Sequence, residues 1–167
     1  MAGMLGRLWT HLFTADAQAR FPADVMDRIA HAITVGESVH SGEVCFAVEA
    51  ALPWREVLRA ADPRQRAMDA FGRLRVWDTA ANNGVLIYLL LADHRIEIVA
   101  DRGLSARVSD EQWRGVCLLM EERLRAGEYA DGVVAGIEAA SDLLAEHFPR
   151  HPTDADEDEL PNRPVFL

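Results

Sequence analysis

The chain of 167 residues has no lysine, only two cysteines, few aromatic residues and no long apolar run. All 17 basic residues are arginines, set against 27 acids, so the formal net charge is −10. A nucleic-acid-binding protein needs a basic face, and none is visible in the sequence. The longest apolar run, residues 84–92, is far shorter than the ~20 residues of a membrane-spanning helix. We therefore predict neither a nucleic-acid partner nor a spanning helix.

The two cysteines do not form a motif. Cys45 and Cys117 each lie inside an apolar run, which favours two buried thiols that pack as small hydrophobic residues. A disulfide is the alternative, but two cysteines alone do not indicate an oxidising compartment. The N-terminal segment imitates a signal peptide only weakly, because Arg7, Thr10 and His11 break its apolar part. We predict a cytoplasmic protein, with peripheral contact to the inner membrane left open.

Length and composition predict one globular domain with short extensions. A domain of this size buries roughly 70% of its unfolded surface, so it needs no disulfide or metal to fold. We expect an N-terminal helical extension at 1–38, an α/β domain at 39–149 and an acidic, mobile tail at 150–167. Five of the acids fall within residues 154–159. The final PNRPVFL is apolar again, and two placements stay open for it: against the domain or against a partner.

A hairpin between Asn82 and Gly103 is the clearest local prediction. Val85–Leu91 is nearly unbroken apolar sequence, typical of a strand covered on both faces, and Arg95–Val99 alternates. The turn between them is too short for a parallel connection, so the two strands pair antiparallel. The outer ends of the hairpin must therefore meet at one end of the sheet.

The remaining pattern predicts one more strand and several helices. A strand at Glu43–Glu49 precedes a helix at about 53–74, kinked at Pro63 and capped again at Asp62, which makes the first strand parallel to 85–91. A helix at about 22–36 precedes the first strand, and helices at about 109–127 and 129–147 follow the hairpin. Leu58, in the helix at 53–74, and Leu119 are among the residues expected to face inward. The fold class is α/β: a three-layer α/β/α sandwich with a small mixed sheet of three to four strands and helices on both faces.

Residues 1–13 have apolar side chains at helical spacing and predict a short amphipathic helix. Three placements are open: packing on its own domain, which we favour, docking on a partner, or lying on a membrane surface. Because a single arginine accompanies this helix, attraction to anionic lipid is expected to be weak.

The polar residues at the end of the hairpin form the candidate site. Asp78, Asn82 and Asn83 precede the first hairpin strand, Asp101 follows the second, and Asp110 begins the next helix. Carboxylate and amide oxygens are the ligands that Ca²⁺, or Mg²⁺, takes in proteins. The alternative is that these residues serve turns and a helix cap alone, since Asn and Asp are ordinary turn formers.

A hydrolase would need a nucleophile or a metal-activated water. Ser41, next to His40, and Ser105 are the available hydroxyls, but neighbours in sequence are not a catalytic pair. Arg102 and Arg107 could bind an anion near the helix that starts at Ser109, or pair with surface acids. His94 falls at the opposite end of the sheet and is not expected to join the site.

The order of these segments resembles the TPM domain family over about residues 40–148. The matching pieces are Asn83-Gly84-Val85-Leu86, Asp93–Ile98, Gly103-Leu104, Ser109-Asp110 and the segment from Gly127 to Ile137. The chain is similar to the short stand-alone bacterial type, often encoded beside a LemA-like membrane protein.

The resemblance implies a modest set of functions. Some members of the family bind calcium, some are accessory factors of membrane complexes, and some are weak acid phosphatases. We therefore expect a non-enzymatic binding or accessory module that takes a divalent cation and acts with a LemA-like membrane protein. The alternative is a weak metal-dependent acid phosphatase, a phosphomonoesterase.

Overall fold

The computed structural model describes residues 2–14, 16–151, 153 and 159–167. Within these residues the chain forms seven helices and a four-stranded mixed sheet. The elements are α1 (Ala2–Phe13), α2 (Ala17–Arg20), α3 (Ala23–Glu37), β1 (Glu43–Glu49), α4 (Trp54–Leu58), α5 (Pro63–Arg73), β2 (Gly84–Leu90), β3 (Arg95–Ala100), α6 (Asp110–Arg125), α7 (Tyr129–His147) and β4 (Val165–Phe166).

The strands lie side by side in the order β3-β2-β1-β4. β1 and β2 are parallel, with Glu43 opposite Gly84, and β2 and β3 are antiparallel, with Val85 opposite Ala100. Both predicted pairings are confirmed. The antiparallel register fixes which loops meet: the segment before β2 and the segment after β3 lie at the same end of the sheet.

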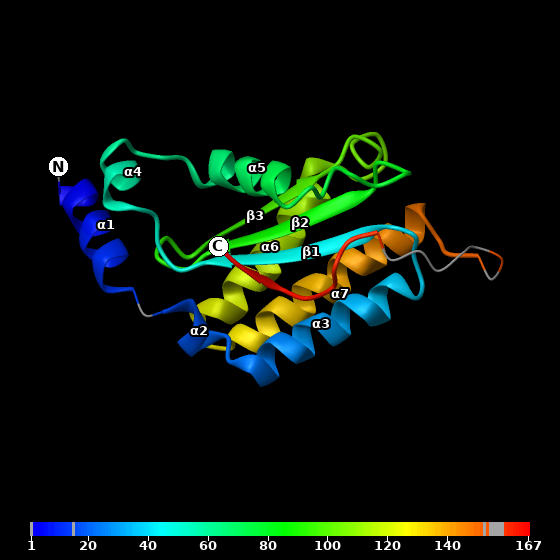
Figure 1. The fold of residues 1–167 in the computed structure, drawn as a ribbon, viewed down its shortest axis with the longest axis horizontal. Coiled ribbons are helices and arrows are strands. Elements are labelled where there is room, and N and C mark those ends of the chain that lie inside the picture. Colours follow the sequence, from blue (N-terminus) through cyan, green and yellow to red (C-terminus); the bar gives the residue numbers. More distant parts are fainter. Residues whose placement is uncertain (1, 15, 152, 154–158) are drawn as a thin grey trace.

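Helices cover both faces of the sheet, which confirms the predicted α/β sandwich (Figure 1). α3, α6 and α7 lie on one face, where Phe46 and Ile87 belong to the larger apolar cluster. α5 lies on the other face, where Cys45 and Tyr88 belong to the smaller cluster. Neighbouring residues of β1 thus point into different clusters, as the two-residue period of a strand requires.

Helix boundaries follow their capping residues. Asp62 accepts a hydrogen bond from the amide of Arg64 at 3.0 Å, so α5 restarts at Pro63 as predicted. Ser109 and Gln112 form a reciprocal capping box at the start of α6, at 3.3 and 2.9 Å. Each of these side chains satisfies backbone groups that a helix end leaves unpaired.

Two predicted inward-facing residues are exposed instead. Leu58 is 45% exposed because α4 ends there and the chain restarts as α5, so no continuous helical face joins the two segments. Leu119 is 36% exposed because the buried face of α6 is set by Val116, Met120 and Leu124. A residue one position from Met120 is rotated by about 100° around the helix.

α1 packs on its own domain, but with its polar side inward. Arg7 Nη2 lies 2.6 Å and His11 Nε2 2.9 Å from the carboxylate of Asp93, in the turn between β2 and β3. His11 Nδ1 also accepts the amide of Leu52 at 2.9 Å, which leaves the ring proton on Nε2 for Asp93. The apolar side of α1 consequently faces outward.

The C-terminal segment docks on the sheet. Val165 and Phe166 pair with Ala47 and Val48 of β1 as the parallel edge strand β4, and the side chain of Leu160 is buried. The mobile tail predicted from the acidic run falls partly on residues 152 and 154–158, which lie outside the described residues. Of the two placements open for PNRPVFL, this one lies against its own domain.

No helix in the described part of the chain is both long enough and apolar enough to cross a bilayer. Both cysteine thiols are free, as predicted, and Cys45 is buried. Burial raises the pKa of each thiol, Cys45 and Cys117, to about 11, which keeps both thiols protonated and unreactive at neutral pH.

Candidate functional site

Two chain segments converge at the end of the β2–β3 hairpin, and we call these residues, 76–84 and 101–104, the loop cluster. The amide of Asp101 donates to the carbonyl of Gly84 at 2.9 Å, and the amide of Gly103 donates to the carbonyl of Asn82 at 2.9 Å. The amide of Asn82 in turn donates to Thr79 at 3.2 Å. The predicted meeting of the two loops is therefore observed.

Two glycines allow the segments to approach this closely. A Cβ on Gly84 would lie 2.0 Å from the carbonyl oxygen of Val76, and one on Gly103 would lie 2.5 Å from that of Asn82. Both contacts are with backbone atoms, which cannot rotate away as a side chain does. The loop cluster therefore requires glycine at both positions.

Asn82 and Asp101 face the same arginine. Arg102 Nε donates to Asn82 Oδ1 at 2.9 Å, and the amide of Arg102 donates to Asp101 Oδ1 at 2.7 Å. Asn82 adopts a positive φ of 52°, a conformation that asparagine tolerates better than most residues. One oxygen from each residue is thus already engaged.

Asn83 is buried and ties the loop cluster to the start of β1. Its amide donates to Thr79 Oγ1 at 3.1 Å, and its Nδ2 donates to the carbonyl of Ser41 at 2.8 Å. Among the described residues, Asn83 Oδ1 and Asp101 Oδ2 are both buried without a hydrogen-bond partner. A buried oxygen left unpaired costs about 1–3 kcal/mol, so a water or another polar ligand is expected to pair with these two atoms.

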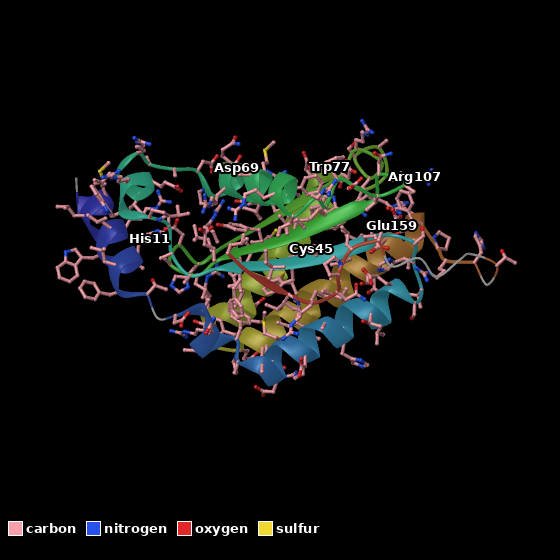
Figure 2. All side chains as sticks on the ribbon, in the orientation of Figure 1. His11, Cys45, Asp69, Trp77, Arg107 and Glu159 are labelled. Carbon is pink, nitrogen blue, oxygen red and sulfur yellow. The ribbon has the colours of Figure 1, made fainter. Side chains whose placement is uncertain are left out.

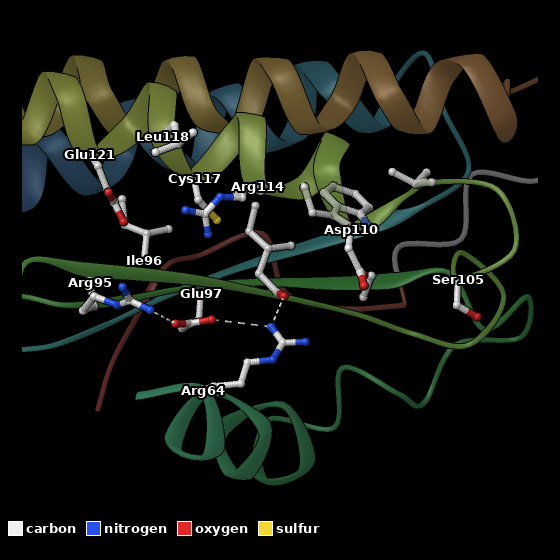
Figure 3. A pocket seen from close by; sticks show the side chains of 14 residues that line it. Arg64, Arg95, Ile96, Glu97, Ser105, Asp110, Arg114, Cys117, Leu118 and Glu121 are labelled. Carbon is white, nitrogen blue, oxygen red and sulfur yellow. Dashed lines mark hydrogen bonds and ion pairs between the residues drawn. The ribbon is translucent and has the colours of Figure 1, made fainter. Parts of the chain in front are cut away.

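The other two predicted ligands have different surroundings. Asp78 is exposed and forms an ion pair with Arg75 at 3.2 Å. Asp110 is the first residue of α6 and lines a surface pocket of about 390 Å³ between β3, α5 and α6 (Figure 3). Within the described chain, no three His, Cys, Asp or Glu side chains gather as a metal centre. Any cation here would have to rely on amide oxygens and water as well as carboxylate.

The pocket along β3 is lined by charges of both signs. Glu97 pairs with Arg95 at 2.9 Å and with Arg64 at 3.7 Å, and Arg64 also donates to the carbonyl of Ile98 (Figure 3). These contacts cover part of the outer edge of β3, which a bare edge strand would expose. These charged side chains are therefore already paired with one another, and the pocket is not a candidate ligand site.

The hydroxyls considered as nucleophiles serve the backbone. Ser41 Oγ lies 3.5 Å from the carbonyl of Phe148, and Ser105 Oγ donates to the carbonyl of Arg102 at 2.8 Å. His40 is fully buried, and neither of its ring nitrogens has a hydrogen-bond partner in the described part of the chain. The His40–Ser41 neighbours therefore do not form a catalytic pair in this structure.

A buried serine, Ser141, lies near His40, and no sequence pattern predicts this proximity. A Cβ on Gly36 would lie 2.2 Å from Ser141 Oγ and 3.2 Å from His40 Nε2, so both side chains approach α3 at this glycine. Ser141 Oγ has no hydrogen-bond partner among the described residues. Only the packing of α3 against α7 reveals this proximity, since 101 positions separate the two residues in the chain.

The two predicted anion-binding arginines have other partners. Arg102 contacts Asn82 as described above. Arg107 lies over the ring of Phe148, 5.0 Å from its centroid, and donates to the carbonyl of His147 at 3.2 Å. His94 lies in the turn at the far end of the hairpin, as expected, with a positive φ of 49°.

That far end contains a second polar cluster that sequence analysis did not identify: Arg7, His11 and Asp93. Figure 2 labels His11 on α1, well away from Trp77 and Arg107. Burial alone would raise the pKa of Asp93, but hydrogen bonds from Arg7 and His11 outweigh it and hold that pKa below its usual value. The cluster fastens α1 to the hairpin turn.

Comparison with known proteins identifies relatives of this fold. A family model described as the TPM domain matches residues 15–143. The solution structure of the BA42 protein from the psychrophilic bacterium Bizionia argentinensis is 33% identical, with a TM-score of 0.77 over 88% of this chain and 95% of that one. The N-terminal domain of a protein from P. gingivalis shares the fold, with a TM-score of 0.61 at 19% identity over 78% of this chain and 83% of that one. A comparison with curated proteins found no match.

Proposed function

The chain belongs to the TPM domain family, and on that premise we propose that it is a non-enzymatic binding module that takes a divalent cation at the loop cluster. The observation that supports the cation is the pair of buried, unpartnered oxygens, Asn83 Oδ1 and Asp101 Oδ2, among the described residues. Ca²⁺ takes six to eight oxygens and accepts carboxylate, amide, carbonyl and water ligands together.

The donor set fits such an ion in its chemistry. Asp101 brings the negative charge and Asn83 a neutral oxygen. Asn82 adds a third donor once its Oδ1 leaves Arg102, which now holds it at 2.9 Å. Asp78 and Asp110 complete the predicted set as outer acids, and waters fill the rest. With so few carboxylates, we expect weak binding, with a Kd of about 10⁻⁴–10⁻³ M.

The test is a titration of metal-free protein with Ca²⁺ and, separately, Mg²⁺, followed by backbone amide NMR shifts. We expect the amides of residues 82–84 and 101–103 to move first. Asp101→Asn should remove the saturable shift, because it deletes the charge while keeping the shape. Asp69→Asn, a surface carboxylate on α5, is the matched control. Titrations in which these loop amides do not respond would refute the site.

A non-enzymatic role is supported by the engaged hydroxyls of Ser41 and Ser105 and by the burial of His40. The rival proposal, a weak metal-dependent phosphomonoesterase, would use a cation-activated water at the same loop cluster. Hydrolysis of p-nitrophenyl phosphate that needs Ca²⁺ or Mg²⁺ and disappears in Asp101→Asn would favour the rival. Activity that survives in Asp101→Asn would exclude the loop cluster as its source.

The proposed partner is a LemA-like membrane protein, and this part rests on the family resemblance alone. Co-purification from detergent extracts of cells that express both proteins, with tagged protein as bait, tests it. A partner that remains in the flow-through under conditions where the bait is folded would refute this pairing.

A further inference from the structure

α1 and α4 together form an outward apolar surface at one end of the molecule, beside each other in Figure 1. We call this surface the α1–α4 face. Its side chains are large, apolar and exposed by 45–70%: Leu5, Trp9, Leu12 and Phe13 from α1, and Trp54 and Leu58 from α4. The rings of Trp9 and Phe13 stack at 4.7 Å, so they form one continuous aromatic surface.

The helix cannot bury this surface by turning over. Its inner side is held by Arg7 and His11, which both bond Asp93, and by the His11 contact to the amide of Leu52. Rotation of α1 would break these bonds and leave Asp93, whose side chain is only 12% exposed, without Arg7 and the His11 hydrogen bond. These polar contacts therefore hold α1 with its apolar side facing outward.

The residues of α1 and α4 themselves carry more basic than acidic side chains, and the exposed acids Asp16 and Asp62 lie just beyond these two helices. The net charge of the chain is −10. α1 contains Arg7 and no acid, while α4 and the next residue contribute Arg55 and Arg59 against Glu56. Glu56 is paired with Arg66 at 3.6 Å, and both Arg55 and Arg59 are exposed. Folding thus places the exposed Arg55 and Arg59 beside α1, whose own Arg7 is paired with Asp93.

We propose that the α1–α4 face docks on an anionic lipid bilayer, with α1 lying in the plane of the interface. Tryptophan and arginine are the side chains suited to the headgroup region, because each has an apolar body and a polar or charged tip. Arg55 already lies over the Trp54 ring, 5.2 Å from its centroid, so aromatic and cation point to the same surface. An interfacial helix binds through buried apolar area plus attraction to anionic lipid, and this face offers both.

A second copy of the chain fits the same face less well. A two-fold symmetric contact would bring Arg55 and Arg59 near their own counterparts, which adds like-charge repulsion. An anionic bilayer turns the same arginines into favourable contacts. The proposal does not rest on the cation site, because the loop cluster lies at the other end of β2 and β3.

Co-sedimentation of the full chain with vesicles tests this inference. Vesicles of phosphatidylcholine with about 30% phosphatidylglycerol are compared with pure phosphatidylcholine, at low and high salt. We expect binding to the anionic vesicles that falls as salt rises. Trp9→Ser with Phe13→Ser should weaken it at least about tenfold, and Arg55→Gln with Arg59→Gln about fivefold per charge on anionic vesicles only.

The matched control is Met68→Ser with Leu118→Ser, which removes two similarly exposed apolar side chains away from both the α1–α4 face and the loop cluster. This control should bind as the unchanged protein does. Absence of binding to anionic vesicles, or equal binding by the Trp9/Phe13 double variant, would overturn the proposal. Sedimentation velocity measures whether the protein forms a dimer. A dimer that is lost in the Trp9/Phe13 double variant, in protein that does not bind vesicles, would also refute the proposal.

Discussion

His40 makes the protein sensitive to mild acid, and the size of the effect follows from its burial. The side chain is fully buried, and neither ring nitrogen has a partner within the described residues. Burial lowers the pKa of His40 from 6.5 to about 4; an interaction with the Gly42 backbone opposes this shift, and the nearby Arg150 adds to it. His40 therefore binds a proton below about pH 6.5 in the unfolded chain, but only below about pH 4 in the folded protein.

The stability that neutral His40 contributes is complete above pH 6.5 and is lost as the pH falls from 6.5 towards 4. A gap of about 2.5 units at 1.36 kcal/mol per unit sets the full loss at about 3 kcal/mol. At pH 5 about 2 kcal/mol should already be gone. Urea unfolding at pH 7.5, 6 and 5, followed by circular dichroism, measures this loss directly.

Two variants separate His40 from other titrating groups. His40→Leu should flatten the stability profile between pH 7.5 and 5 and change the neutral-pH stability by only about 1 kcal/mol, since the ring gives up at most one interaction, with the Gly42 backbone. His31→Gln removes an exposed histidine and should keep the profile. Asp93, whose pKa is lowered, loses its contribution only at more acidic pH. An unchanged acid profile in His40→Leu would refute the reasoning.

Three further predictions concern packing and ion pairs. Gly84→Ala should lower the free energy of unfolding by at least about 2 kcal/mol, and the thermal midpoint with it, because its Cβ would meet a backbone carbonyl. Gly72→Ala, in an open helical position, should instead raise the free energy of unfolding by up to about 1 kcal/mol. Equal effects of the two substitutions would contradict this prediction. Arg66→Met should lower the free energy of unfolding, measured in urea, by about 3–5 kcal/mol, because it leaves the buried Glu49 carboxylate without the guanidinium that lies 2.6 Å away. A loss below about 1 kcal/mol would argue against a stabilising ion pair. Asp93→Asn should loosen α1 and make its peptide bonds sensitive to limited proteolysis while the core stays resistant; an unchanged digestion rate would show that other contacts hold the helix.

Elements with unambiguous hydrophobic patterns are predictable from sequence alone. β1 and α7 begin and end where the pattern predicts, and the hairpin is formed because its turn is too short for any other pairing. The proximity of Asn82 and Asp101 follows from that hairpin. Their hydrogen bonding does not follow, because Arg102 reaches Asn82 only through the local path of the loop.

The rest depends on contacts between distant residues. An amphipathic pattern locates the apolar side of α1 but does not say which side is inward, and here an acid 82 residues away from His11 decides it. The same holds for β4, whose two residues are too short for a strand signal and are defined only by pairing with β1. Ser141 and His40 likewise meet only because α3 packs against α7.

The β2–β3 hairpin joins the two polar ends of the molecule and sets how they can communicate. The seven residues of β2 span about 23 Å between the loop cluster and the Asp93 turn. That separation exceeds twice the screening length of about 8–10 Å at physiological salt. Exposed charges gained at one end are therefore largely screened from the other end. The fully buried side chains of β2 also resist any slip of register, so the two ends are held at a fixed distance from each other.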